Sequence, residues 1–260
     1  MKGKIYKILM SICVLSVIML SVPAGLMAQE EKEEKETSPL SLQYGADLVS
    51  RYVWRGMQFG TGAHIQPYGN IVFSTGSHSL SFGAWGSYDL GGKTDSVSTY
   101  SEFDLSLRYS FATETIGTFS LGAADYYYPY LKIPYSNFDK DGLGGHTVEL
   151  SVAYQGPESL PVSLLVSSNF LNDLPEEKSF YFETGYSLNL KDVPISFFAG
   201  FAQGVSTWHQ VYSDKVELIN LGVSASRSFP ITENYSVTAT VSLVRNTCLR
   251  EYHPTIKLSF

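Results

Sequence analysis

The stretch that decides the fold is Tyr252-His253-Pro254-Thr255-Ile256-Lys257-Leu258-Ser259-Phe260. Its even-numbered residues are Tyr, Pro, Ile, Leu and Phe, and its odd-numbered residues are His, Thr, Lys and Ser. Residues two apart share one face of a β-strand, so this strand has an apolar face and a polar face. In a chain that begins with an export signal, such a strand indicates a boundary between lipid and water. The stretch therefore predicts a transmembrane β-barrel.

The same alternation recurs along the chain and predicts about twelve strands. One face of the first strand carries Leu42, Tyr44, Ala46, Leu48, Tyr52 and Trp54. The other face carries Asp47, Arg51 and Arg55, charges that a soluble core would not bury. The other predicted strands lie at residues 64–73, 79–89, 102–109, 118–130, 147–154, 162–170, 180–190, 195–203, 219–226, 235–243 and 252–260.

The lengths of the connections support an all-β, antiparallel up-and-down barrel. Short connections such as 75–78 and 191–194 alternate with longer ones such as 90–99 and 131–143. Barrels of the outer membrane place short turns in the periplasm, so an even strand count predicts that both termini are periplasmic. Aromatic residues near the strand ends, including Tyr52 and Trp54, predict interfacial girdles. The alternative is a soluble sandwich or lipocalin-like barrel, whose apolar face would point inward.

The first 40 residues predict export followed by a spacer. A basic start and an apolar run from Ile8 to Leu20 indicate a signal peptide at 1–28, cleaved after Ala28. Residues 29–40 predict an acidic periplasmic linker, and 41–260 the barrel. Cleavage removes three lysines and no acidic residue, so the formal net charge moves from −7 to −10. That balance argues against nucleic acid as a partner, and the single remaining Cys248 excludes an intrachain disulfide.

Two segments resemble a known family. Ser50-Arg51-Tyr52-Val53-Trp54-Arg55-Gly56 resembles the first-strand pattern Ser-x-Tyr-x-aromatic-Arg-Gly of the TorF-like porins, bacterial outer-membrane β-barrels. Gly83-Ala84-Trp85-Gly86-Ser87 is similar to that family's Gly-x-Trp-x-Ser segment, and Gln66 stands where the family tends to have glutamine.

The resemblance covers residues 41–88 and the C-terminal Phe260, with two departures from the pattern. Arg51 replaces a common acidic residue and Ala63 a common proline. The resemblance implies a porin-type barrel in the outer membrane of a Gram-negative bacterium. Phe260 resembles the assembly signal of such barrels, which implies recognition of the C-terminal strand by the outer-membrane assembly machinery.

The charged residues of the polar face are expected to line the lumen. They are Asp47, Arg51, Arg55, Glu102, Asp104, Arg108, Glu149 and Glu183. One hypothesis is a narrow aqueous path on which these charges select small solutes for passive transport. The other is that opposite charges pair across a nearly filled lumen. Arg55 and Gly56 are expected to shape the first outer loop, and Trp85, on the polar face, to plug the lumen or offer a stacking surface.

Two further functions compete with transport. An outer-membrane lipid hydrolase would need Ser and His on the lipid face, and His146 and Ser168 share that face, but we see no orienting residue beside them and no Gly-x-Ser-x-Gly motif. The other is a structural or adhesive barrel. We therefore expect no enzyme, no catalytic residue and no cofactor. The isolated His64, His78, His209 and His253 predict no metal site. The expected partners are outer-membrane lipid, the assembly machinery and small solutes.

Overall fold

The computed structural model describes residues 38–91, 99–174, 176–177 and 179–260. The predicted signal peptide and residues 29–37 of the predicted linker lie outside the described residues. Residues 38–229 and 237–260 belong to one compact unit, which is the barrel. No helix in the described ranges has the length and hydropathy to cross a membrane.

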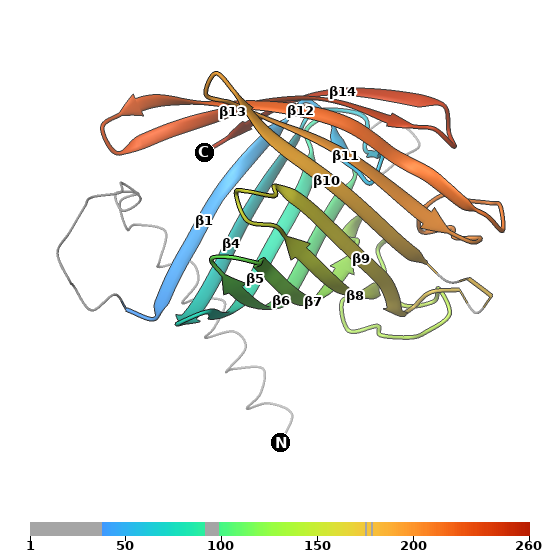
Figure 1. Ribbon diagram of the computed structural model, residues 1–260. Helices are drawn as coiled ribbons and strands as arrows, with labels where there is room; N and C mark the ends of the chain where they lie inside the picture. Colours follow the sequence, from blue (N-terminus) through green and yellow to red (C-terminus); the bar gives the residue numbers. More distant parts are fainter. Residues whose placement is uncertain (1–37, 92–98, 175, 178) are drawn as a thin grey trace. The chain divides into compact units, whose positions relative to one another are not determined.

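Twelve strands of the described chain form a closed antiparallel ring (Figure 1). They are β1 (Leu40–Val49), β4 (His64–Thr75), β5 (His78–Asp89), β6 (Ser101–Thr113), β7 (Gly117–Tyr127), β8 (His146–Gln155), β9 (Val162–Leu171), β10 (Phe180–Leu190), β11 (Val193–Gln203), β12 (Val216–Thr232), β13 (Tyr235–Asn246) and β14 (Glu251–Ser259). The ring closes because β1 pairs with both β4 and β14. The predicted fold class is confirmed, with β7 ending at Tyr127, before the short helix η2 (Pro129–Leu131).

The two faces of the ring have opposite polarity. The outward side chains are apolar and exposed, for example Leu42 at 58%, Leu121 at 58% and Val241 at 54%. Inward positions such as Ser87 and Glu149 are polar and buried. A soluble barrel would show the reverse, so the soluble alternative is wrong and the fold is an outer-membrane-type barrel.

The first strand is shorter than predicted because the chain reverses soon after it. β1 ends at Val49, and β2 (Tyr52–Trp54) then pairs with β3 (Met57–Phe59). The two turn residues, Arg55 at φ 49° and Gly56 at φ 79°, both adopt left-handed backbone conformations. Positive φ at both positions is the requirement of a type I′ turn, which joins antiparallel strands through two residues. The Arg55-Gly56 turn therefore reverses the direction of the chain soon after β1.

The β2–β3 hairpin lies inside the barrel. The Tyr52 ring is 5.5 Å from the Trp85 ring on β5, and the Trp54 ring is 5.9 Å from the Tyr126 ring on β7. A Cβ on Gly56 would lie 1.9 Å from the carbonyl oxygen of Ile219 on β12. Contacts with strands on several sides of the ring place the hairpin across the lumen. The prediction that Tyr52 and Trp54 belong to a lipid-facing girdle is wrong.

The polarity of the ring predicts how charged substitutions act. Val241→Arg places a cation on the outward apolar face of β13 and should destabilise the barrel by about 2–4 kcal/mol near the bilayer midplane. Ser242→Arg, one residue further, lines a lumen cavity with Asp47 and should have little effect. Urea unfolding of protein folded into lipid vesicles measures both changes. Equal destabilisation by the two variants would contradict the assignment of faces.

Candidate functional site: a hairpin held in the lumen

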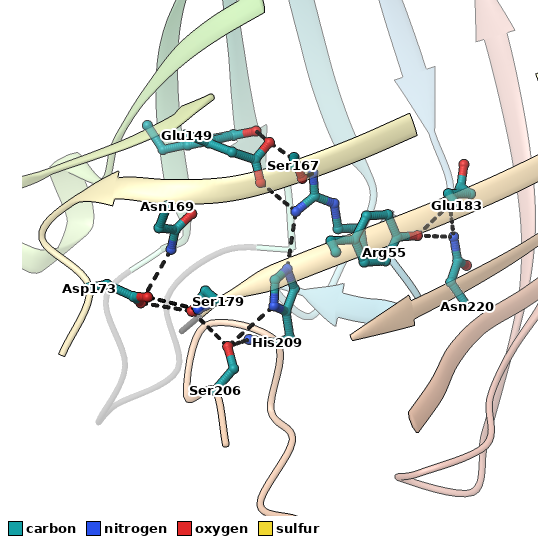
Figure 2. A network of polar contacts seen from close by, with 12 residues as sticks. Arg55, Glu149, Ser167, Asn169, Asp173, Ser179, Glu183, Ser206, His209 and Asn220 are labelled. Carbon is teal, nitrogen blue, oxygen red and sulfur yellow. Dashed lines mark hydrogen bonds and ion pairs between the residues drawn. The ribbon is translucent and has the colours of Figure 1, made fainter. Parts of the chain in front are cut away.

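Arg55, at the tip of the hairpin, forms a buried ion pair with Glu149 on β8 (Figure 2). Nη1 donates to Oε2 at 2.6 Å and Nη2 to Oε1 at 2.8 Å. Nη2 also donates to Ser167 Oγ on β9 at 3.0 Å. The two side chains are only 8% and 5% exposed. A bidentate geometry fixes the direction of the guanidinium as well as its position, so the ion pair orients the hairpin tip.

Aromatic rings enclose the Arg55 guanidinium. Its Cζ lies 4.3 Å from the centre of the Trp54 ring and 4.1 Å from that of Tyr181 on β10. Tyr126 on β7 donates its hydroxyl proton to Glu149 Oε1 at 3.2 Å. Cation–π contacts and exclusion of water both strengthen a buried cation's interactions. The hairpin tip is thereby attached to β7, β8, β9 and β10.

His209, in the 204–215 loop, is a further hydrogen-bond partner of Arg55. Its Nε2 is 3.0 Å from Arg55 Nη1. A guanidinium can only donate, so Nε2 accepts and His209 is neutral with its proton on Nδ1. That proton points to Ser206 Oγ at 3.2 Å. Burial, and then the charge of Arg55, lower the pKa of His209 from 6.5 to about 3.

Hydrogen bonds carry the network from His209 into a second loop. Ser206 Oγ lies 2.7 Å from Ser179 Oγ, and Ser179 Oγ donates to Asp173 Oδ1 at 2.7 Å. Asn169 also donates to this carboxylate, at 3.4 Å (Figure 2). The loops at 172–179 and 204–215 are therefore joined to each other and to the hairpin tip.

A separate polar group stands beside this network. Glu183 on β10 accepts hydrogen bonds from Tyr181 and from Asn220 on β12, the latter at 2.7 Å. Asn220 Nδ2 is also 3.1 Å from the Tyr181 hydroxyl oxygen. Because Tyr181 stacks on both Arg55 and His209, these bonds hold the ring that the guanidinium covers.

Most family-motif residues hold the hairpin or the wall next to it. Trp85 on β5 packs against Tyr52 of the hairpin, with ring centres 5.5 Å apart. Gln66 donates to Ser87 Oγ at 3.2 Å, and His64 Nδ1 lies 2.9 Å from the same oxygen. Ser50 makes two hydrogen bonds with Ile256 on β14: its N–H donates to the Ile256 carbonyl, and its Oγ accepts from the Ile256 N–H. At Gly83, a Cβ would lie 2.4 Å from Asn70 Oδ1.

The eight predicted lumen residues fall into pairs and separate positions rather than one cluster. Asp47 pairs with Lys257 at 3.3 Å, and Arg51 donates to Gln58 within its own hairpin. Glu102 accepts from Tyr100 at 2.8 Å. Within the described residues, Asp104 Oδ1 is buried without a partner. Arg55, Arg108, Glu149 and Glu183 line one cavity.

Cavities lie in the lumen beside the hairpin, and two of them share part of their lining. The first has a volume of about 450 Å³ and contains the four charged residues named above. The second, of about 280 Å³, is lined by Asp47, Arg51 and Lys257 among others. The three side chains common to both linings are apolar: Val53, Phe198 and Val244. The two cavities therefore each carry charged side chains and share an apolar part of their lining.

The sequence analysis missed Tyr181 and treated His209 as an isolated histidine. Both contact Arg55 although they lie 126 and 154 residues further along the chain. Tyr181 offered a usable signal, because it lies on the inward parity of β10 next to Glu183. His209 lies in a loop, where alternation predicts nothing. Within the described residues, no group of three or more His, Cys, Asp or Glu side chains could hold a metal ion.

His146 does have an orienting residue, contrary to our prediction. Its Nδ1 lies 2.9 Å from Asp125 Oδ2, and its Nε2 lies 2.7 Å from the carbonyl oxygen of Tyr135. Phe138 stacks on the imidazole at 4.0 Å between ring centres. Both ring nitrogens therefore face oxygen acceptors, and His146 attaches the 128–145 loop to the barrel rim.

Removing Arg55 should release the hairpin. Arg55→Ala leaves Glu149 buried without its counter-ion, which typically costs about 3–5 kcal/mol. Arg51→Ala is the matched control, because the hydrogen bond that Arg51 makes to the described residues is to nearby Gln58 and not to the barrel wall. Urea unfolding and limited proteolysis at residues 50–63 measure the difference. Equal behaviour of the two variants would contradict a special role for Arg55.

Acid should weaken the contact between the 204–215 loop and the hairpin. His209 is neutral when docked, and its pKa is lowered to about 3, so a released His209 binds a proton below about pH 6.5. The docked loop therefore loses stability as the pH falls from 6.5 toward 3 and is insensitive above that range. Tryptophan fluorescence of Trp54 and Trp208 follows the change. His209→Gln, which cannot titrate, should flatten the profile, and an unchanged profile in that variant would contradict the assignment.

Comparison with known proteins gives a fold and no family. No protein-family model matches the chain, and no curated protein matches it. Among solved structures, it is similar to the crystal structure of the Salmonella typhi outer membrane phospholipase (OMPLA) dimer with bound calcium. The two are 12% identical, with a TM-score of 0.44, over 87% of this chain and 92% of that chain. At this distance the likeness concerns the fold and assigns no activity.

The comparison nevertheless corrects one expectation. The prediction that the chain is not an enzyme is contradicted, because the similar solved structure is that of a phospholipase. A barrel of this class does not by itself exclude catalysis. What stands is the coarser statement that the chain forms a twelve-strand β-barrel of the outer-membrane type.

Proposed function

We propose that this protein is an outer-membrane porin that lets small solutes pass through a lumen narrowed by the β2–β3 hairpin. The observation that carries the proposal is the pair of charged cavities beside the hairpin, of about 450 and 280 Å³. A twelve-stranded barrel encloses more space than an eight-stranded barrel. The interior of an eight-stranded barrel can be filled by its own side chains. Charged side chains in the remaining space require water, and connected water is a path for solutes.

The hairpin sets the width of this path. Tyr52, Trp54 and Arg55 project from it to several sides of the ring, and the Arg55–Glu149 pair holds it in place. Val53 on the hairpin faces the cavities together with Phe198 and Val244 on the wall. An apolar constriction between charged chambers raises the barrier for ions more than for neutral solutes, because ions must shed water there.

Membership of the TorF-like porins is part of the proposal. It is supported by the gathering of Tyr52, Trp54, Arg55, Gly56, Gln66, Trp85 and Ser87 at or beneath the hairpin, which gives the shared motif a common structural role. Surrounding outer-membrane lipid, periplasmic termini and recognition of the Phe260 strand by the assembly machinery complete the proposal. In the barrel, Phe260 pairs with Ala46 through two backbone hydrogen bonds of 2.9 and 3.3 Å.

Conductance in planar bilayers tests the function. The wild-type protein should form a small-conductance channel and let liposomes swell in small neutral solutes. Replacing residues 52–59 with a Gly-Ser segment of equal length removes the obstruction, so the conductance should rise several-fold. Replacing residues 136–141 of the 128–145 loop with a Gly-Ser segment of their own length does not touch the lumen cavities and is the control.

Two results would contradict the proposal. Absence of conductance and of swelling in both the wild-type protein and the folded hairpin variant would remove the porin function. A folded hairpin variant with wild-type conductance would keep a channel but remove the hairpin as its constriction. Heat-modifiable migration on gels checks that each variant forms a barrel.

A further inference from the structure

A third cavity lies at the long-loop end of the barrel, between the hairpin and the surrounding loops. Its volume is about 430 Å³, within the range of small-molecule sites. It is formed by the hairpin, by residues 172–174 and Glu177, and by residues of the loops at 128–145 and 204–215. We call this cavity the vestibule. It stands where a solute arriving at that end would meet the hairpin.

Aromatic rings make up much of the vestibule wall. Trp54 and Trp208 meet edge to face with centres 5.7 Å apart, and Tyr128 lies 6.1 Å from Trp208. Tyr130 lies 6.2 Å from Tyr128 and also lines the vestibule. Rings from three different segments thus offer apolar surfaces to one space. Such surfaces suit a ligand with an apolar face.

The acidic side chains of the vestibule are already engaged. Asp173 accepts hydrogen bonds from the Ser179 amide and hydroxyl at 2.8 and 2.7 Å. Glu177 accepts from the Thr207 amide and hydroxyl at 2.7 and 2.6 Å. Glu177 joins its loop to the 204–215 loop, whereas Asp173 bonds within its own loop, and no Lys or Arg among the described residues lines the cavity. An anionic ligand would therefore meet negative charge without a counter-ion.

Groups that both donate and accept remain available for a ligand. The side chains of Thr147, Tyr130 and Gln210 line the vestibule and make no hydrogen bond with the described residues. Gln210 also has a left-handed backbone, with φ at 53°. That conformation is costly for a residue with a side chain, and such outliers concentrate at ligand sites. Its backbone N–H bonds the carbonyl of Thr207 at 3.1 Å, so the loop turn that presents the amide is fixed.

From these observations we propose that the vestibule binds a neutral saccharide, about the size of a mono- or disaccharide. A sugar ring has an apolar C–H face for the Trp54, Trp208 and Tyr130 rings, and a rim of hydroxyls that both donate and accept. The amide of Gln210 and the hydroxyls of Thr147 and Tyr130 match that rim. The walls are braced by the Asp173 and Glu177 contacts, so little ordering accompanies binding. This inference rests on the proposed function, in which the saccharide is the solute presented to the channel.

Calorimetric titration of the full chain in detergent tests the site with maltose, glucose and galacturonate as probes. Maltose or glucose should bind saturably, and galacturonate at least about tenfold more weakly, because the carboxylates repel it. Trp208→Ala and Gln210→Ala should each weaken binding by about tenfold, as truncation of an anchoring side chain does. Tyr212→Ala and Gln203→Ala are matched controls, since neither side chain lines the vestibule.

The outcomes separate this proposal from the porin function. Absence of saturable binding to either neutral sugar, or unchanged binding in the Gln210→Ala variant, would overturn the saccharide site while leaving conductance untouched. Preferred binding of galacturonate would overturn it as well. Sugar binding in a protein that gives neither conductance nor liposome swelling, with the folded hairpin variant equally inactive, would support the site and remove the porin function. Gln210→Ala decides the matter if Trp208→Ala, which also loses packing with Tyr126, fails to fold.

Discussion

The structure depends on one buried ion pair between the barrel wall and a hairpin that the barrel encloses. Arg55 and Glu149 lie 94 residues apart in sequence and meet with almost no exposed surface. A buried charge without its partner is strongly unfavourable, so each residue requires the other to be in place. The cation–π contacts of Trp54 and Tyr181, and the neutral His209, complete the enclosure of the guanidinium. The hairpin is thereby held across the lumen.

The same constraint accounts for the polar chemistry of the interior. The lumen charges are spread over separate chambers, with Asp47 and Lys257 in one and Arg108 and Glu183 in another. Val53, Phe198 and Val244 line both cavities and are apolar. Of the two sequence hypotheses, internal pairing of charges describes Arg55 with Glu149 and Asp47 with Lys257, and the solute path stays a proposal.

Alternation of polar and apolar residues was enough to predict the ring, because a barrel wall leaves a period of two in every strand. It failed between Ser50 and Phe59, where the same alternation continues through Tyr52 and Trp54 into a hairpin that faces no lipid. Period alone cannot separate lipid from a packed lumen, since both accept aromatic rings. The Arg55-Gly56 turn was the missed signal. The contacts of Asp125 with His146 and of His209 with Arg55 join distant loops and strands, and no local pattern encodes them.

The seam between β1 and β14 has a mechanical consequence. β1 pairs with β4 over its full length, but its bonds to β14 and Phe260 run only from Ala46 to Ser50. Under force or in denaturant, the barrel is therefore expected to open first by separation of β1 from β14. β1, once separated from β14, is followed directly in the chain by the hairpin. Opening of the barrel wall and withdrawal of the hairpin from the lumen are therefore coupled.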